Sequence, residues 1–360
     1  MHPCTRPWPR SLRWRRALQL LAGLSLVTSG CSASSGGNDE VQQGPAGPAG
    51  TTPTDPSLRV AFIGDQGLGV DAVAVLQLIA DEGADFVIHS GGLDGSGDAV
   101  AWMDQIDAVL GDDYPYFAAI GNDDATWWDD YRAELEQRLA ATAGAECEGD
   151  ELGVTSACTY RGLFFVLSGA GTRGTVDHET FLTQALADDD SIWRVCSWHV
   201  TRGDFQVGSR GDEAPLSAYQ ACAMGRALII NAHEHSYSRT LTLSDVDAPD
   251  RDYAPTGAAN EMLVTEGSTF VTVSGLGGRN RSNYDAAAHD ADTWWASIYG
   301  GGHYLHDGQV ETFFDYDFGA LFIDFHINAD ERRARGFFKS VAGDVVDEFY
   351  VTTDRRLPDE

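Results

Sequence analysis

Side chains able to bind a metal follow the apolar segments of this chain. An aspartate ends "AFIGD", an asparagine follows "AAIG", a histidine ends "VCSWH", and two more histidines lie two residues apart in "AHEH". These residues are Asp65, Asn122, His199, His233 and His235. One carboxylate, one amide and three imidazoles form a mixed nitrogen and oxygen set that suits Zn, Fe or Mn, as one ion or as two.

Each of these residues also has an ordinary structural explanation when it is taken alone. Asp and Asn are common turn residues, and a lone histidine is more often a hydrogen-bonded core residue. Their shared position at the ends of successive apolar segments is the informative feature. Ligands of open α/β sheets gather at the carboxyl ends of the strands, so the pattern predicts a single polar site at that edge.

The apolar segments alternate between two periodicities, and these define the elements that would position the site. Buried strands are predicted at 58–65, 84–92, 114–122, 163–169, 192–199, 227–235 and 270–278. Helices are predicted at 70–83, 98–111, 128–140, 176–189 and 215–225. This order predicts an α/β fold of buried, largely parallel strands with helices outside. The C-terminal segments 320–330, 335–341 and 344–353 are predicted to be antiparallel strands that complete a second sheet.

The first 30 residues have the pattern of a bacterial lipoprotein signal. A basic "RSLRWRR" precedes the apolar "ALQLLAGLSLV", and "TSGC" places small residues before Cys31. The apolar run is too short to span a bilayer. We expect export across the inner membrane and a lipid anchor on Cys31, in the periplasm or on the outer membrane. Ordinary secretion and an uncleaved membrane anchor are the alternatives.

The composition separates a tether from one large domain. Residues 31–57 are rich in Ser, Gly, Pro, Thr and Gln, which predicts a flexible segment, and 58–355 are long enough for one domain with its own core. The formal net charge of the chain is -31. Such a charge argues against binding to nucleic acid. No contact with a membrane is expected beyond the lipid anchor, and the sequence does not indicate an oligomeric state.

Four cysteines remain after Cys4 and Cys31, an even number for an oxidising compartment. Cys147 and Cys158 flank a short segment predicted to be a loop, so we pair them. Cys196 lies in a predicted strand and Cys222 in a predicted helix, where they could form a second disulfide. Two buried free thiols are the equally favoured alternative for this second pair.

Taken in order, the motifs resemble those of the calcineurin-like metallophosphoesterase superfamily, specifically its purple-acid-phosphatase-like branch. The family motifs D-x-G, G-D-x-x-Y, G-N-H-D/E, V-x-x-H and G-H-x-H are matched by "DQG" at Asp65, "GGLDG" at Gly91, "GNDD" at Gly121, "VCSWH" ending at His199 and "AHEH" at Ala232. The resemblance spans about residues 59–278. It implies a four-layer α/β/β/α sandwich of two mixed sheets with outer helices.

The resemblance also implies an activity and roles for individual residues. The family hydrolyses phosphomonoesters or phosphodiesters with a metal-bound hydroxide, so a small phosphorylated substrate is implied. Asp65 and His235 would hold one metal, and Asn122, His199 and His233 would hold the other. Arg279 follows "GLGG" and could reach the substrate phosphate. A solvent-facing loop residue is the alternative for Arg279.

Three positions depart from the family pattern. Gly92 stands where the family has the bridging Asp, Gly95 where it has a Tyr ligand, and Asp123 where it has the catalytic His. Two divalent ions about 3.5 Å apart repel by about 19 kcal/mol at an effective dielectric of about 20, so the loss of the bridge weighs against two metals. Asp94 could swing into the place of the bridge, and Asp123 could bind metal or compensate charge, which makes both candidate catalytic residues.

Two hypotheses therefore follow from the sequence. The first is a metal-dependent phosphoesterase with an altered site that holds one metal or a rearranged pair. The second is a catalytically inactive domain of the same fold that serves as a binding or structural module on the cell envelope. Both share the predicted fold, and fold alone does not determine function.

Overall fold

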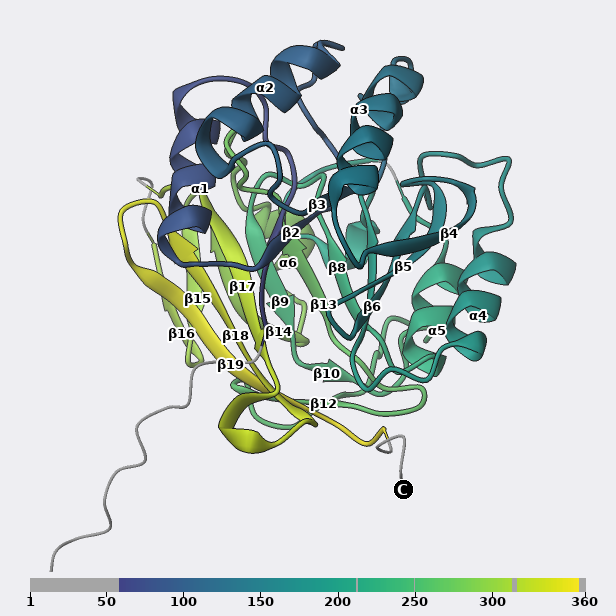
Figure 1. Cartoon of the computed structure of the whole chain (residues 1–360). Helices are drawn as coiled ribbons and strands as arrows, with labels where there is room; N and C mark the ends of the chain where they lie inside the picture. The colour runs from purple at the N-terminus through teal and green to yellow at the C-terminus, as the bar shows by residue number, and fades with distance from the viewer. Residues whose placement is uncertain (1–57, 212, 249, 313–315, 356–360) are drawn as a thin grey trace, which may run out of the picture. The chain divides into compact units, whose positions relative to one another are not determined.

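Two large β-sheets make up most of the described part of the chain, which is residues 58–355 without 212, 249 and 313–315 of this computed structural model (Figure 1). The predicted signal, the tether and Cys31 lie outside the described residues. Within the described residues, no helix is both long enough and apolar enough to cross a membrane.

The first sheet has seven strands and joins the two ends of the domain. Its order is β12 (Glu261–Val264), β19 (Val345–Thr353), β18 (Arg333–Ser340), β17 (Gly319–Phe325), β1 (Leu58–Ile63), β2 (Phe86–His89) and β3 (Tyr116–Ala118). Strands β1, β2 and β3 are parallel, whereas β17 pairs with β1 in antiparallel register. The prediction that the C-terminal strands complete a second sheet is wrong. They extend the first sheet, because β1 pairs with β2 along one edge only and its other edge is free to pair with β17.

The second sheet has ten strands and comes from the middle of the chain. Its order is β16 (Gln309–Glu311), β15 (His303–His306), β14 (Trp295–Gly300), β9 (Tyr237–Thr240), β13 (Val271–Ser274), β8 (Leu228–Asn231), β7 (Arg194–Trp198), β6 (Leu163–Ser168), β5 (Thr155–Tyr160) and β4 (Glu146–Glu151). The central strands β6, β7, β8 and β13 are parallel, and antiparallel strands flank them on both sides. A separate pair joins β10 (Thr242–Leu243) to β11 (Pro255–Thr256).

Helices cover the outer faces of both sheets. Their bounds are α1 (Val70–Asp81), α2 (Ala99–Leu110), α3 (Trp128–Ala141), α4 (His178–Asp188), α5 (Leu216–Met224) and α6 (Ala286–His289), with 3-10 turns η1 (Gly203–Phe205) and η2 (Ile327–Ala329). Helices α1, α2 and α3 pack on the seven-stranded sheet, and α4 and α5 pack on the ten-stranded sheet (Figure 1). The predicted α/β sandwich of two mixed sheets with outer helices is confirmed.

Buried apolar side chains join these layers. The larger cluster includes Phe62 of β1, Phe322 of β17 and Ile230 of β8, so it links the two sheets. The smaller cluster includes Leu182 of α4 and Ile229 of β8, so it holds the helices on the ten-stranded sheet. The two clusters explain why the strands are apolar on both faces, since every central strand is covered on both sides.

Both cysteine pairs form disulfides. Cys147 of β4 lies directly opposite Cys158 of β5, and Cys196 of β7 is bonded to Cys222 of α5. The segment between Cys147 and Cys158 was predicted to be a short loop, but it is a β-hairpin. Its first strand, β4, is largely exposed and acidic at the edge of the sheet, so hydrophobic periodicity gives no signal there.

Candidate functional site

The loops that follow β1 and β2 are joined at one edge of the seven-stranded sheet. The backbone N–H groups of residues 65–67 donate to the carbonyl groups of residues 91–93 at 2.7–3.0 Å. These bonds extend the parallel pairing of β1 and β2 beyond the strands. The polar side chains that follow the two strands are therefore held in a fixed relation, as the sequence pattern predicts for strand ends.

Asp124 joins a third loop, the one that follows β3, to the loops after β1 and β2. This residue was not among the site residues predicted from the sequence. Its buried carboxylate accepts hydrogen bonds from the N–H groups of Gly92 at 2.9 Å, Leu93 at 3.0 Å and Gly121 at 2.8 Å. Burial raises the pKa of Asp124, although His199 and the three backbone donors favour its charged form. The segment "GNDD" contains Asp124, but the sequence does not show which backbone N–H groups its carboxylate will meet.

Asp65 lies at the centre of the buried polar residues. Its Oδ1 is 3.2 Å from His235 Nε2 and 3.8 Å from His199 Nε2, and its Oδ2 accepts a 2.8 Å hydrogen bond from the N–H of His233. Burial by itself would raise the pKa of Asp65, but the histidines outweigh burial and hold that pKa well below its usual value. The carboxylate is therefore anionic at neutral pH.

Two of these residues have a strained backbone. Asp65 has a φ of 55° and His233 a φ of 71°, in the left-handed region that residues other than glycine rarely adopt. Such conformations cost about 1 kcal/mol or more and concentrate at functional sites, where surrounding bonds enforce them. The hydrogen bond from the His233 N–H to Asp65 is one such bond.

His199 and His233 face one another with their ring nitrogens close. His199 Nε2 lies 3.3 Å from His233 Nδ1, and the other nitrogen of His199, Nδ1, lies 3.0 Å from the carbonyl oxygen of Ser90. A donor bond from Nδ1 to Ser90 fixes the tautomer of a neutral ring and leaves the lone pair on Nε2. The structure thus brings together four of the five predicted metal ligands: Asp65, His199, His233 and His235.

Asn122, the fifth predicted ligand, bonds to Asp123 and not to the other four predicted ligands. Asn122 is exposed, and its Nδ2 donates to Asp123 Oδ1 at 3.3 Å. The other oxygen of Asp123 forms an ion pair with Arg279 Nη1 at 2.5 Å. Asp123 and Arg279, which were predicted to act in catalysis and in phosphate binding, therefore neutralise one another.

Solved structures with similar architecture decide the fold family. A purple acid phosphatase from yellow lupin (Lupinus luteus) seeds matches with a TM-score of 0.55 and 16% identity over 83% of this chain and 55% of that one. The chain has a calcineurin-like metallophosphoesterase fold. The identity is low, so the likeness is one of fold, and this chain spans only 55% of the lupin enzyme.

Two further structures match less well. One is GAP50, the anchor in the inner membrane complex of Plasmodium, with a TM-score of 0.49 and 15% identity over 83% of this chain and 91% of that one. The other is a dimetal phosphatase from Danio rerio, with a TM-score of 0.45 and 11% identity over 83% of this chain and 99% of that one. No protein-family model and no curated protein matches the sequence.

In this metallophosphoesterase fold, the places of two anionic ligands are already filled. A Cβ added to Gly92 would lie 2.6 Å from Asp65 Oδ1 and 2.8 Å from His199 Cε1, which are distances that real Cβ atoms do not show. A Cβ added to Gly95 would lie 2.6 Å from Cζ of Arg279. The guanidinium of Arg279 therefore lies against the position where the resemblance places a Tyr ligand.

Asp94 is fully engaged in a turn. It accepts hydrogen bonds from the N–H groups of Ser96, Gly97 and Asp98 at 2.8–3.0 Å, and from the hydroxyl groups of Ser96 and Tyr131. Burial opposes its charge, but these donors outweigh burial and lower its pKa. The bonds shape the approach to α2 and occupy both carboxylate oxygens.

A second guanidinium lies beside His235, and the sequence offered no motif for it. Arg210 Nη2 is 3.0 Å from His235 Nε2, and Arg210 Nε is 3.7 Å from Glu234 Oε2. Glu234 is almost completely buried, and burial raises its pKa. Arg210 lies in a loop of polar residues and glycines, where only the tertiary structure places it beside the histidines.

The side chains present do not fit the two-metal centre of the fold family. Among the described residues, no three or more His, Cys, Asp or Glu side chains are arranged to hold a metal ion. No carboxylate can bridge from Gly92, Asp94 is engaged, and Asn122 is bonded to Asp123. Two arginines lie where a cationic site would repel them.

Proposed function

We propose that this domain is a non-catalytic module that retains the phosphoesterase fold and has lost the two-metal hydrolysis. The observation that carries the proposal is the lack of room at Gly92, where an added Cβ would lie within 3 Å of Asp65 Oδ1 and His199 Cε1. A pair of divalent ions needs shared anionic ligands to offset their repulsion. The chain supplies neither the carboxylate nor the room for it.

The distribution of charge around the site supports the same proposal. Arg279 pairs with Asp123, and Arg210 pairs with Glu234 and contacts His235. These guanidinium groups supply fixed positive charge where metal ions would otherwise supply it. The buried Asp65 is stabilised by its histidine neighbours. The resulting network is structural and self-neutralising, and we propose that it serves binding or positioning on the cell envelope, with Cys31 as the lipid anchor.

A one-metal phosphoesterase is the second candidate, and one distance favours it. His199 Nε2 and His233 Nδ1 are 3.3 Å apart, close to the separation of two nitrogen ligands that share one ion at about 2.0–2.1 Å each. Asn122 would have to leave Asp123 to complete three ligands. Such an enzyme would act on a small phosphorylated substrate.

Metal content and turnover of the purified protein distinguish these candidates. Elemental analysis after dialysis against Zn, Mn or Fe, paired with hydrolysis of an aryl phosphate, is expected to give less than one metal per chain and no turnover. One bound metal with turnover that is lost in His199→Ala would establish the second candidate. Two bound metals with turnover would overturn the argument from Gly92.

A further inference from the structure

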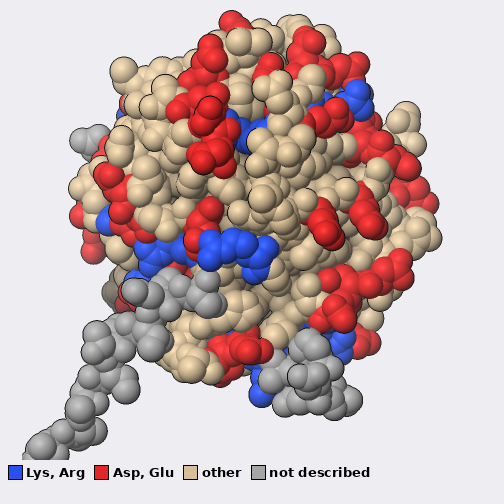
Figure 2. All heavy atoms as spheres, in the orientation of Figure 1, with Lys and Arg blue, Asp and Glu red and all other residues tan. Residues whose placement is uncertain are grey.

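A hollow of about 530 Å³ is lined by residues of α4, α5 and the segment after β19, and by Arg194 at the start of β7, the strand that His199 follows at its other end. Three of its lining residues are arginines, Arg194, Arg226 and Arg355, and we call it the arginine hollow. Basic residues are scarce in this chain, which has 24 Lys and Arg against 55 Asp and Glu. On the face drawn in Figure 2, acidic atoms are widely spread and basic atoms are confined to a few places. Three arginines in one hollow are therefore unexpected.

Two of the three positive charges are neutralised within the protein. Arg194 Nε lies 2.6 Å from Asp189 Oδ2, and its Nη1 donates to the carbonyl of Gly225 at 3.0 Å. Arg226 pairs with Asp354 at 3.0 Å and with Glu266 at 2.8 Å.

Arg355 differs from the other two. No carboxylate among the described residues lies within ion-pair distance of it, and its Nη2 makes only a 3.4 Å bond to the carbonyl oxygen of Asp189. Its Nε is buried and has no acceptor among the residues that the structure describes. Burial and the neighbouring charge of Arg194 lower the pKa of Arg355, whereas the nearby Asp189 raises it. An anion in the hollow would supply a charge partner for the guanidinium of Arg355.

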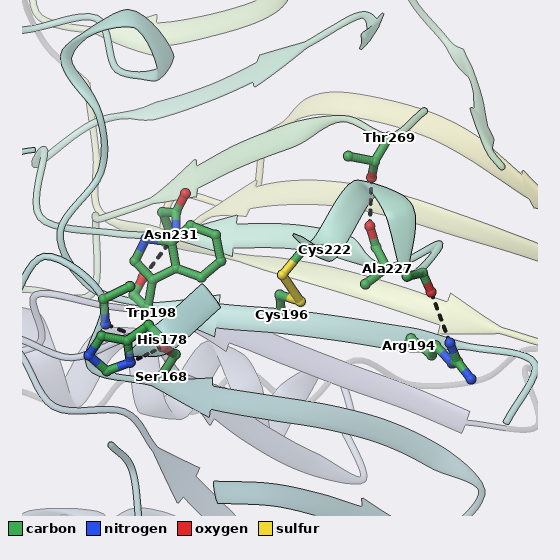
Figure 3. Close-up of a disulfide and its surroundings, with 11 residues drawn as sticks. Ser168, His178, Arg194, Cys196, Trp198, Cys222, Ala227, Asn231 and Thr269 are labelled. Carbon is green, nitrogen blue, oxygen red and sulfur yellow. Dashed lines mark hydrogen bonds between the residues drawn. A yellow bond between two sulfur atoms is a disulfide. The ribbon is translucent and has the colours of Figure 1, made fainter. Parts of the chain in front are cut away.

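The walls of the arginine hollow are fixed before any ligand arrives. The disulfide between Cys196 and Cys222 fastens α5 to β7, the strand that begins at Arg194 (Figure 3). At the end of α5, a Cβ on Gly225 would lie 2.6 Å from Cδ1 of Leu186 in α4, so the two helices are in close contact. A rigid site loses little entropy when a ligand binds.

Other lining residues define the chemistry that the hollow would accept. Thr183, Ser217 and Gln220 provide hydroxyl and amide groups, and Met224 provides an apolar surface. Glu179 also lines the hollow and disfavours ligands with many negative charges. The volume is in the range of about 300–1,000 Å³ that is usual for small-molecule sites and exceeds the need of a bare ion.

We propose that the arginine hollow binds a small molecule with a phosphate group, which Arg355 holds through the Nη donors of its guanidinium. Guanidinium groups bind phosphate through paired, charge-assisted hydrogen bonds. This site is separate from the loops around Asp65 and requires no metal, so it is independent of the proposed function.

Calorimetric titration of the purified protein with inorganic phosphate and with glycerol 3-phosphate tests the proposal. We expect one site per chain for at least one of the two probes, and the tighter probe identifies a free or an esterified phosphate. Arg355→Ala is expected to weaken binding by about tenfold or more, which is the loss of one charge-assisted bond. Arg355→Lys keeps the charge without the paired donors and should give an intermediate loss. If the alanine variant does not fold, Arg355→Lys replaces it as the test of binding.

Two arginine variants serve as controls. Arg132 is a partly exposed arginine of α3 with carboxylate partners, so Arg132→Ala should leave phosphate binding unchanged. Arg279→Ala removes the guanidinium of the loop site and should also leave it unchanged. Absence of binding by both probes would overturn the proposal. A loss of binding in Arg279→Ala with none in Arg355→Ala or Arg355→Lys would also overturn it, because the anion would then bind at the loop site.

Discussion

At the residue scale, Gly92 determines the chemistry of the loop site more than any other position. Its φ of 74° and the absence of a Cβ allow Asp65 and His199 to approach its backbone. The N–H of Gly92 donates to Asp124, so the residue is part of the frame that joins three loops. A residue with a side chain would have to displace Asp65 or His199, the two groups that would otherwise bind metal.

Replacing Gly92 by Asp is therefore expected to destabilise the protein in the presence of a chelator. The new carboxylate would enter beside the buried Asp65 without a counter-ion, at a cost of about 1–3 kcal/mol in the free energy of unfolding. Denaturant unfolding measures this change. Gly92→Asn is the matched control, because Asn has the same shape and tolerates a left-handed backbone but carries no charge. Equal stability of the Asp and Asn variants near pH 7 would contradict the prediction.

At the element scale, the two disulfides fasten elements of different importance. Cys196 and Cys222 join the central strand β7 to α5, whereas Cys147 and Cys158 join β4 and β5 at the edge of the same sheet. The chain between the paired cysteines is also longer in the first pair, with a separation of 26 residues against 11. Both differences predict that the Cys196–Cys222 disulfide contributes more to the free energy of unfolding than the Cys147–Cys158 disulfide does.

Removal of the Cys196–Cys222 disulfide by a double alanine substitution is expected to lower the free energy of unfolding by about 3.5 kcal/mol in the chain-entropy treatment. The same change at Cys147 and Cys158 is expected to cost about 2.8 kcal/mol, because the closed loop is shorter. Denaturant midpoints of the two double variants provide the comparison. A larger loss for the edge pair would show that loop entropy does not control these contributions.

The short helix α6 is held by a histidine with two acceptors. His289 Nδ1 lies 2.8 Å from Asp292 Oδ2, and its Nε2 lies 3.0 Å from the carbonyl oxygen of Gly208. Two acceptors require a proton on both nitrogens, which is the charged ring. Burial opposes that charge, but the bonds to Asp292 and Gly208 outweigh burial and raise the pKa above 6.5.

This arrangement predicts a pH dependence of stability. The folded pKa of His289 is higher than the unfolded value, so its contribution is complete below about 6.5 and is lost as the pH rises through the folded pKa. Urea unfolding at a series of pH values from below 6.5 upward should show a decline in the free energy of unfolding. His289→Asn should remove the part of this decline that comes from the histidine. Asp292→Asn removes the carboxylate partner of His289 and should also reduce the pH-dependent decline in the free energy of unfolding. An unchanged pH profile in both variants would exclude His289 as its source.

At the scale of the whole domain, one buried ion pair joins the two sheets. Arg239 of β9 bonds to both oxygens of Asp347 in β19, at 2.8 and 2.9 Å, and the hydroxyl of Tyr237 donates to Asp347 at 2.6 Å. Arg239 also lies over the ring of Phe349, with Cζ 4.0 Å from the ring centre. The group is polar and buried, and its charged atoms are hydrogen-bonded between the two sheets.

Removing one member of this pair should be far more harmful than removing both. Asp347→Ala leaves a buried guanidinium without its partner and is expected to cost about 3–5 kcal/mol. The double change Arg239→Met with Asp347→Ala removes both charges and should cost clearly less than Asp347→Ala alone. Thermal or denaturant unfolding of the wild type, the single variant and the double variant measures the difference in stability. If the double variant is the least stable, the pair stabilises the interface itself.

Hydrophobic periodicity in the sequence predicted an α/β fold and its central elements, whereas the sandwich of two mixed sheets was predicted from the resemblance of the motifs to a known family. The strands β1, β2, β3, β6, β7 and β8 are rich in apolar residues because they are covered on both faces, and the five long helices have regular apolar spacing. The order of polar residues at the strand ends also predicted which histidines would meet Asp65. These features are local or repeat along the chain, so the sequence alone carries them.

Only the tertiary structure decided what those residues can do. The neighbours of β17, the position of Arg279 against Gly95 and the approach of Arg210 to His235 all depend on segments far apart in the sequence. The roles of Asp94 and Asp124 depend on backbone N–H groups, which every residue except proline has and which no motif can reveal. Long-range packing and backbone hydrogen bonds have no sequence period, and for that reason the sequence determined the framework of this protein but not the chemistry of its site.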